Sequence, residues 1–150
     1  MCGKCSPYID QAIAYCETHG LRLTEPRAQV LAIVVEAAKS ITAYEALAEL
    51  GKVVKNPKPP TVYRALEFLQ EAGLVHRIES LNAYVVCHGG HGHHHNHQNG
   101  QFLICDECGD VQEVHMTQVE KTIDNKAHDM GFKPKNWSTE IHGTCKDCCK

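Results

Sequence analysis

Four cysteines in the last third of the chain form two pairs with the spacing of a metal site. Cys105 and Cys108 are one C-x-x-C pair, and Cys145 and Cys148 are the other. A C-x-x-C turn aims two thiolates at one point, so two such turns can supply the tetrahedral four-sulfur shell that zinc accepts. Because that shell leaves no position open, the pattern predicts a structural zinc site and not a catalytic one. Buried or redox-active cysteines are the alternative, but two such pairs in one domain rarely serve those roles.

A second set of metal-binding side chains flanks a stretch rich in histidine, glycine and asparagine at 88–100. His76 and Cys87 precede this stretch, His97 lies near its end, and Glu113 follows it. A mixed nitrogen, sulfur and oxygen set suits zinc. An ion held from both sides of a linker would fix the angle between the flanking parts, which is a physical basis for sensing. Each residue also has an ordinary interpretation, as a strand histidine, a small buried cysteine or a solvated carboxylate.

Several other histidines compete for the role given to His97. Tracts of this composition bind metal loosely, so the stretch could also serve as a low-affinity reservoir or a solvated loop. A third C-x-x-C pair, Cys2 and Cys5, is weaker evidence of a metal site because chain termini fray. The competing histidines are His88, His91, His93, His94 and His95.

The elements that must position these side chains follow from the apolar spacing. In the first half that spacing predicts four helices, and on the third we expect Tyr44, Leu47 and Leu50 to recur. The predicted helix starts are Ser6–Pro7, Pro26, Thr42 as a cap, and Pro60–Thr61.

After Gly73 the apolar period changes to about two. Residues 74–78 and 84–86 are therefore predicted strands of a hairpin, and helices followed by such a hairpin are typical of a winged helix. In the second half, 117–130 is a predicted helix that Gly131 ends. The predicted strands of the second half are 102–104, 111–114 and 137–142.

We expect an α+β protein built from three parts. Residues 1–86 are the winged-helix domain, 87–100 are a His-rich hinge, and 101–150 are an α/β domain with the four-cysteine zinc site. Two halves of about 75 residues each would be marginally stable alone. A metal or a partner chain is therefore expected to add stability.

The predicted helix after Pro60 has the features of a DNA-reading helix. Thr61, Tyr63 and Arg64 project away from its buried face. Arg64 can fork onto a guanine in the major groove, while Thr61 and free backbone N–H groups suit a phosphate. Tyr44 could reach a base methyl group or the backbone. An ordinary amphipathic helix is the alternative, because the first 80 residues hold nine basic and nine acidic side chains.

The composition excludes several other classes of protein. The N-terminus lacks the apolar run of a secretory signal, and no segment has the length of a membrane span. We therefore expect a cytoplasmic protein, in which nine cysteines serve metals better than disulfides. The net charge of −3 gives no global basic signature. No H-E-x-x-H motif or comparable open zinc site occurs, so we expect no enzymatic activity.

With these motifs the chain resembles the ferric uptake regulator (Fur) family, and most closely its zinc uptake regulator (Zur) branch. The resemblance covers nearly the whole chain. It includes the His-rich stretch, which stands directly before a strand that ends in a cysteine. The segments that carry it are Gly20–Thr24 with Pro26–Arg27, Pro60–Leu66, Phe102–Gly109 and Cys145–Cys148.

This resemblance implies a winged-helix domain, a hinge and an α/β dimerisation domain. It also implies a homodimer that binds an inverted-repeat DNA operator when loaded with metal. Tyr44 and Arg64 match base-reading positions of the family. The structural zinc site is matched by Cys105, Cys108, Cys145 and Cys148, and the regulatory zinc site by His76, Cys87, His97 and Glu113.

The expected metal follows from the ligand at the regulatory site. The iron and peroxide branches use nitrogen and oxygen ligands there, whereas Cys87 softens the site and favours zinc. Trp137 stands where the iron branch carries a histidine ligand of a further site. One departure concerns His97, which is one residue farther from Cys105 than the zinc branch implies, so His88, His93 or His95 could replace it.

The sequence therefore predicts a zinc-responsive repressor of zinc uptake genes, with two zinc ions per subunit. The first alternative keeps the fold and changes the metal to iron or manganese. The second is a zinc-storage protein that uses the His-rich stretch.

Overall fold

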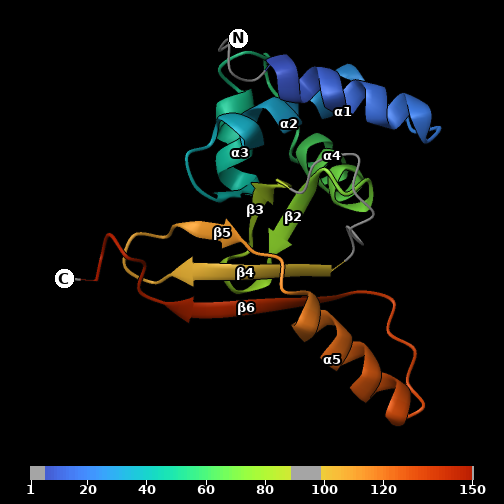
Figure 1. The fold of residues 1–150 in the computed structure, drawn as a ribbon. Helices are drawn as coiled ribbons and strands as arrows, with labels where there is room; N and C mark the ends of the chain where they lie inside the picture. The colour runs from blue at the N-terminus through green and yellow to red at the C-terminus, as the bar shows by residue number, and fades with distance from the viewer. Residues whose placement is uncertain (1–5, 89–98, 150) are drawn as a thin grey trace. The chain divides into compact units, whose positions relative to one another are not determined.

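The computed structural model describes residues 6–88 and 99–149 (Figure 1). The chain divides into two compact units, Met1–His95 and Asn96–Lys150. The division falls inside the expected hinge at 87–100. The three-part boundaries drawn from the sequence remain a prediction.

The first unit contains the four expected helices. Proline occupies one of the first two positions of the second and fourth, where its missing N–H costs nothing. The fourth helix begins one residue earlier than predicted, at Pro59. The four helices are α1 (Ser6–Thr18), α2 (Glu25–Glu36), α3 (Ala43–Leu50) and α4 (Pro59–Glu71).

Helix α3 starts with a reciprocal cap. The Thr42 hydroxyl accepts from the Glu45 N–H at 3.2 Å, and the Glu45 carboxylate accepts from the Thr42 N–H at 2.8 Å. The backbone and hydroxyl hydrogen bonds from Thr42 lower the pKa of Glu45. The expected apolar repeat on this helix is wrong at Tyr44, which is 79% exposed. The buried face consists of Ala43, Ala46 and Leu50.

A small antiparallel sheet completes the first unit. Strands β2 (Val75–Ile78) and β3 (Ala83–Val86) form the expected hairpin. Asn82 turns it with a left-handed φ of 46°. The sheet gains a third strand, β1 (Ile41–Thr42), which pairs with β3. Two residues are too few to show a period, so β1 was not predicted.

The helices and one face of this sheet enclose a single core. Helices α2 and α4 each bury one apolar face, whereas Val35 of α2 is only partly buried. The buried residues are Val30, Leu31 and Val34 on α2, and Val62, Ala65, Leu66 and Leu69 on α4. Tyr84, Val75 and Val86 contribute from the sheet. The largest fully buried core side chains are Leu31, Leu50, Leu66, Leu69 and Leu74.

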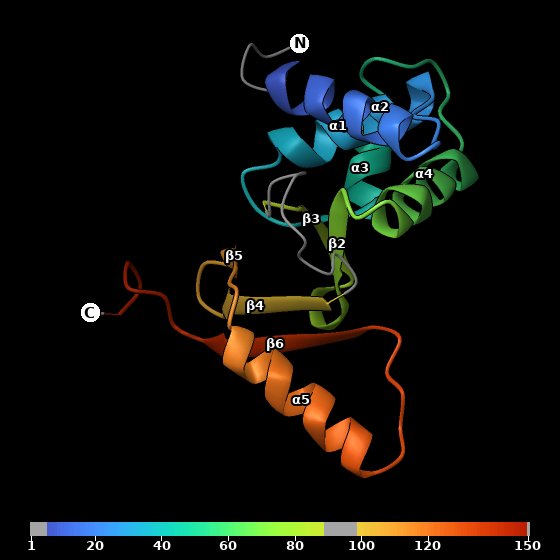
Figure 2. The same ribbon diagram turned by 45° about the vertical axis from the view of Figure 1, so that its right-hand side comes forward.

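The second unit is a three-stranded sheet with one helix. Its strands are ordered β5-β4-β6, with β4 antiparallel to β5 and parallel to β6. Figure 2 shows β4 and β6 side by side, pointing the same way. Its elements are β4 (Asn99–Cys105), β5 (Val111–Glu113), α5 (Thr117–Asp129) and β6 (Trp137–Gly143).

Helix α5 ends at Asp129, one residue earlier than predicted, and Gly131 follows the cap with a left-handed φ of 69°. None of its residues is buried within this chain. Met130 and Phe132, just beyond its end, are 73% and 66% exposed. In the part of the chain that the structure describes, no helix is both long and apolar enough to span a bilayer.

Candidate functional site

The first cysteine knuckle is a tight turn at the end of β4. The Cys105 carbonyl accepts from the Gly109 N–H at 2.9 Å, and the Cys105 N–H donates to the Asp110 carbonyl at 2.9 Å. Gly109 has a φ of +73°, a conformation that costs glycine little and other residues more. The glycine after the pair is therefore a requirement of the turn.

The second knuckle follows β6 and reaches the first because of the sheet topology. Parallel pairing aligns Cys105 with Gly143, so both strands end at the same edge. The Asp106 N–H donates to the Gly143 carbonyl at 2.9 Å, which ties the two turns together. In the second turn the Cys145 carbonyl accepts from the N–H groups of Cys148 and Cys149, at 3.0 and 2.8 Å.

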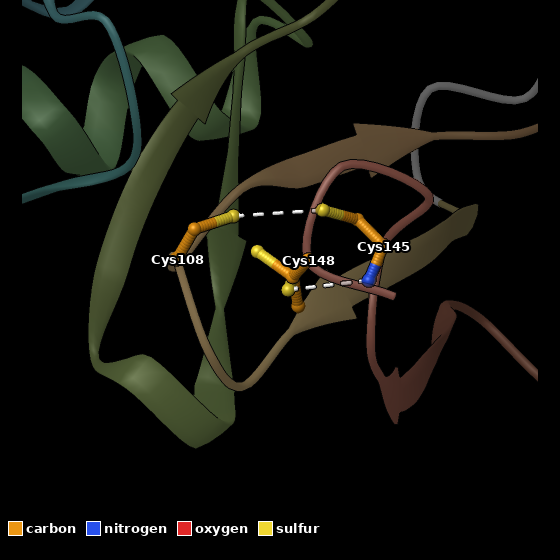
Figure 3. A group of neighbouring side chains, drawn as sticks. Cys108, Cys145 and Cys148 are labelled. Atoms are coloured by element: carbon orange, nitrogen blue, oxygen red, sulfur yellow. Dashed lines mark hydrogen bonds between the residues drawn. The ribbon is translucent and has the colours of Figure 1, made fainter. Parts of the chain in front are cut away.

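The four sulfur atoms converge, as the sequence predicts. The Sγ atoms of Cys105, Cys108, Cys145 and Cys148 all lie within 4.8 Å of one another. Cys108 Sγ and Cys145 Sγ are 3.7 Å apart and point toward each other (Figure 3). A tetrahedral zinc ion with Zn–S bonds of about 2.3 Å places its sulfur ligands about 3.8 Å apart. The spacing and the soft donor set therefore both fit zinc.

The pKa values of the clustered thiols also favour binding of a cation. Backbone hydrogen bonds, led by the Cys145 N–H at 3.3 Å, lower the pKa of Cys105 to about 6. Thiol hydrogen bonds, led by that with Cys145, raise the pKa of Cys148 to about 12. One sulfur therefore ionises readily, while another retains its proton because it is hydrogen-bonded to the neighbouring thiols. A bound dication removes this conflict and allows the thiolates to coexist.

A hydrogen-bonded histidine–aspartate pair beside the knuckles was not foreseen from the sequence. His142 Nδ1 lies 2.8 Å from Asp106 Oδ1, and this hydrogen bond raises the pKa of His142. Asp106 is the residue after the first metal-binding cysteine, so the pair braces the first knuckle against β6. The signal available was the histidine close before the second C-x-x-C pair.

His76 and Cys87 come together through the register of the β2–β3 hairpin. His76 pairs with Val85, and the Cys87 N–H extends the ladder by donating to the Leu74 carbonyl at 3.0 Å. His76 and Cys87 are thus diagonal neighbours on one face of the sheet. The opposite face carries Val75, which packs into the helical core.

The environment of this pair suits a metal. A ring nitrogen of His76 and the Cys87 Sγ lie within 4.8 Å of each other. The two residues are only 7% and 3% exposed. An imidazole and a thiolate at this spacing are a reasonable half of a zinc shell. Burial also protects the thiol from solvent oxidants.

Among the described residues of the first unit, none of the other expected ligands joins His76 and Cys87. Glu113 ends β5 of the second unit and is partly exposed, and His88 is exposed. Cys2 and Cys5 lie outside the described residues. So do His91, His93, His94, His95 and His97.

The expected DNA-reading side chains form an exposed group on the first unit. Tyr44 on α3 is 79% exposed and Tyr63 on α4 is 57% exposed. Thr61 and Arg64 are exposed on the first turns of α4. The opposite face of α4 buries Val62, Ala65, Leu66 and Leu69, which fixes the orientation of the helix.

The backbone at the start of α4 offers fewer donors than expected. Pro59 and Pro60 have no N–H group, and the Thr61 N–H donates to the Lys58 carbonyl at 3.0 Å. The expectation of free N–H groups for a phosphate is therefore wrong at the first three positions. Side chains such as the Thr61 hydroxyl must carry any phosphate contact there.

The chain matches one protein-family model over most of its length. The model of the ferric uptake regulator family matches residues 18–142. The chain belongs to the ferric uptake regulator family. Its members are regulators, in agreement with the expectation of a non-enzymatic protein. Over 140 residues the chain is 41% identical to the zinc uptake regulation protein of Escherichia coli K12, covering 93% of this chain and 80% of that protein.

Solved structures in the Fur family are similar across both units. A zinc uptake regulator complexed with zinc and DNA has a TM-score of 0.89 and 38% identity, over 96% of this chain and 94% of that one. The holo form of XcZur has a TM-score of 0.86 and 38% identity, over 95% and 96%. The expected family and the mixed helix-and-sheet fold are thus confirmed.

Proposed function

We propose that this Fur-family protein is a cytoplasmic, zinc-responsive transcriptional repressor. It binds an inverted-repeat operator as a metal-loaded homodimer and controls zinc uptake genes. The observation that carries the proposal is the buried pair of His76 and Cys87 in a chain that also has a four-cysteine cluster. The similarity to zinc uptake regulators supports the same function.

Each subunit holds two zinc ions with different tasks. One is structural and is held by Cys105, Cys108, Cys145 and Cys148. The regulatory ion is held by His76 and Cys87 from the first unit, by Glu113 from the second, and by one histidine of the His-rich stretch. His97 is our first choice for this histidine, with His88, His93 and His95 as alternates. Zinc supplies a centre that crosslinks these donors without redox chemistry.

Cys87 is the residue that selects the metal. Iron(II) and manganese(II) prefer nitrogen and oxygen ligands, whereas a thiolate with an imidazole favours zinc. Cys87 is 3% exposed, so its thiolate would be costly to bury without a cation. A regulatory site with this ligand therefore favours a response to zinc over a response to iron.

DNA is read by the exposed group on α3 and α4. Arg64 is the residue that discriminates bases, by paired hydrogen bonds to guanine. Tyr44 adds apolar contact, and Thr61 and Tyr63 contact phosphates. The first 80 residues have no net charge. DNA binding therefore depends more on the specific contacts of these side chains than on overall electrostatic attraction.

A second copy of the chain completes the second unit. Helix α5 has apolar side chains but no buried residue, and Met130 and Phe132 are exposed beside it. A twofold partner covers such surfaces and sets two reading helices at the spacing of an inverted repeat. The regulatory ion then sets the angle between units, so metal loading shifts the population toward the DNA-binding shape.

The deciding experiment is a metal titration against operator binding. Full-length protein that retains its structural zinc is titrated with zinc, iron(II) or manganese(II) in metal buffers, and binding to an inverted-repeat operator is followed by fluorescence anisotropy. We expect zinc to activate binding at the lowest free concentration. Activation by iron(II) where zinc fails would overturn the choice of metal and favour the alternative regulator.

The storage alternative makes a different prediction in the same experiment. It requires many zinc ions per chain and no preference for the operator over an unrelated duplex. Counting bound zinc by mass spectrometry under native conditions separates the two functions, because the repressor takes up two ions tightly.

A further inference from the structure

The N-terminal helix contacts the backbone of the regulatory cysteine through one hydroxyl. Tyr8, on the first turn of α1, donates to the carbonyls of Leu74 and Cys87, both at 3.1 Å. These carbonyls are 66 and 79 residues away along the chain. One O–H shared by two acceptors is a three-centre bond, which requires both carbonyls to converge on it.

This contact fixes both backbone polar groups of Cys87. The Cys87 N–H donates to the Leu74 carbonyl at 3.0 Å, and the Cys87 carbonyl accepts from Tyr8. Cys87 lies one residue beyond the end of β3, where a strand would otherwise fray. With both groups held, the direction of its Cα–Cβ bond is set, and the sulfur remains on the His76 side of the hairpin.

The same network reaches the DNA-reading helix. The Leu74 N–H donates to the carbonyl of Leu69, a buried residue of α4, at 2.9 Å. The Leu74 carbonyl in turn accepts from both Cys87 and Tyr8. The ring of Tyr8 packs against the helical core. Helix α1, the end of α4 and the regulatory cysteine therefore meet at one hydrogen-bonded junction.

We propose that Tyr8 is a positioning residue for the regulatory zinc site, through which α1 holds Cys87 ready to bind the ion. This inference rests on the proposed function, because it assigns Cys87 to that site. Removing the hydroxyl takes away one hydrogen bond to the Cys87 carbonyl and loosens the end of β3. Zinc must then order the residue on binding. Loss of a hydrogen bond that orients a metal ligand weakens metal binding by about tenfold or more.

The test compares Tyr8→Phe with Tyr15→Phe in the full-length protein. Tyr15 is on the same helix and contacts His19 instead, so the control removes an equivalent hydroxyl. In Tyr8→Phe we expect the free zinc concentration at half-maximal operator binding to rise about tenfold. Maximal DNA binding at saturating zinc and the structural zinc should stay unchanged. Tyr15→Phe should match the wild type.

Cobalt(II) gives a readout that does not depend on DNA. Added to protein that retains its structural zinc, it should produce the thiolate-to-cobalt absorption band of Cys87, and Tyr8→Phe should shift the midpoint of that band by a similar factor. An unchanged midpoint in both titrations would overturn the proposal, including the case in which Tyr8→Phe only lowers thermal stability.

Two further measurements separate the possible failures. Cys87→Ser tests the proposed function itself: if this variant still responds fully to zinc, the regulatory site is wrong whatever Tyr8 does. Hydrogen exchange can be measured on the wild type, so this test does not depend on whether any variant folds. Regulatory zinc should slow exchange in the first turns of α1 around Tyr8, and unaltered exchange there would contradict the coupling.

Discussion

The four-cysteine cluster and the His76–Cys87 pair are built by opposite strategies. The cluster draws all four sulfurs from two turns of one unit, and backbone hydrogen bonds lock both turns. The pair lies on a hairpin of the other unit. Among the described residues of that unit, no third metal-binding side chain joins it. One donor set is closed within its unit, and the other is open.

In the proposed function, this difference separates a structural ion from a sensing one. A closed set binds its ion whenever the unit folds, so occupancy reports on little else. A pair of ligands such as His76 and Cys87 needs further ligands from outside its unit. The free energy of metal binding is then coupled to the conformational change that brings those ligands close. Two zinc sites in one chain can therefore have different affinities and different consequences when emptied.

The largest effect should come from removing one cysteine of the four-cysteine cluster. We expect Cys105→Ser to unfold the second unit or to leave the protein monomeric, because structural zinc contributes on the order of 10 kcal/mol to small modules. Size-exclusion chromatography with light scattering and zinc analysis measure both outcomes. Cys149→Ser, which removes an exposed neighbouring cysteine, is the control. A normally folded dimer that has lost only one ion would refute the structural role.

Substituting Cys87 should weaken the response to zinc and leave the protein folded. We expect Cys87→Ser to remain a folded dimer with its structural zinc, while the zinc needed for operator binding rises about a hundredfold. Circular dichroism, zinc content and anisotropy titrations measure these separately. A variant that unfolds as Cys105→Ser does would remove the distinction between the two sites.

A change at the DNA-reading surface should leave both metal sites intact. We expect Arg64→Ala to weaken specific operator binding by about 1–3 kcal/mol, because its paired hydrogen bonds to guanine are lost. Thr61→Ala is the comparison, since loss of its proposed phosphate contact should weaken binding to all sequences alike. Equal losses on operator and unrelated DNA for Arg64→Ala would exclude a base-reading role.

The smallest effect is expected at the cap of α3, which contributes no ligand to either proposed metal site. Thr42→Ala removes the cap of α3 and should cost about 1 kcal/mol of unfolding free energy, while Thr42→Ser keeps the hydroxyl. Urea unfolding of the zinc-loaded proteins measures this. An unchanged urea midpoint in Thr42→Ala would show that the cap does not stabilise α3.

The same cap predicts a pH dependence. The pKa of Glu45 is lowered in the folded protein. Its contribution is therefore present above the pKa of the unfolded chain and is lost as the pH falls through the folded value. Glu45→Gln should flatten this acid-side loss, as measured by urea midpoints across the acidic range. A Glu45→Gln variant with the same acid-side slope as the wild type would contradict the assignment.

Local chemistry and the meeting of the two cysteine pairs could be predicted from the sequence, whereas long-range contacts without a metal-binding motif could not. The C-x-x-C pairs, the proline helix starts and the glycine turns depend on neighbouring residues, and the structure has them where expected. Strand β1 exists only through its pairing with β3, and it has no pattern of its own. The hydrogen bonds of Tyr8 and the Asp106–His142 pair join distant residues, so no spacing rule indicates them.

The errors have the same physical origin. Tyr44 continues an apolar repeat in the sequence, but the helix buries the small side chains of Ala43 and Ala46 instead. Free backbone N–H groups were expected at the start of α4, yet the prolines that predict this helix have no N–H group to donate. In both cases the residue type was informative and its partner was not visible in the sequence.

Parallel pairing of β4 with β6 dictates when, during synthesis, the ion can be captured. Cys105 and Cys108 leave the ribosome before α5 and β6 exist, and a loop of 36 residues must then close at an entropic cost on the order of 3 kcal/mol. Until then the first thiols are a solitary pair, open to oxidants. In a zinc-starved cell a newly made chain would take longest to acquire its structural ion. In the proposed function, zinc supply would therefore limit how many folded repressor molecules are made, before any of them responds to zinc.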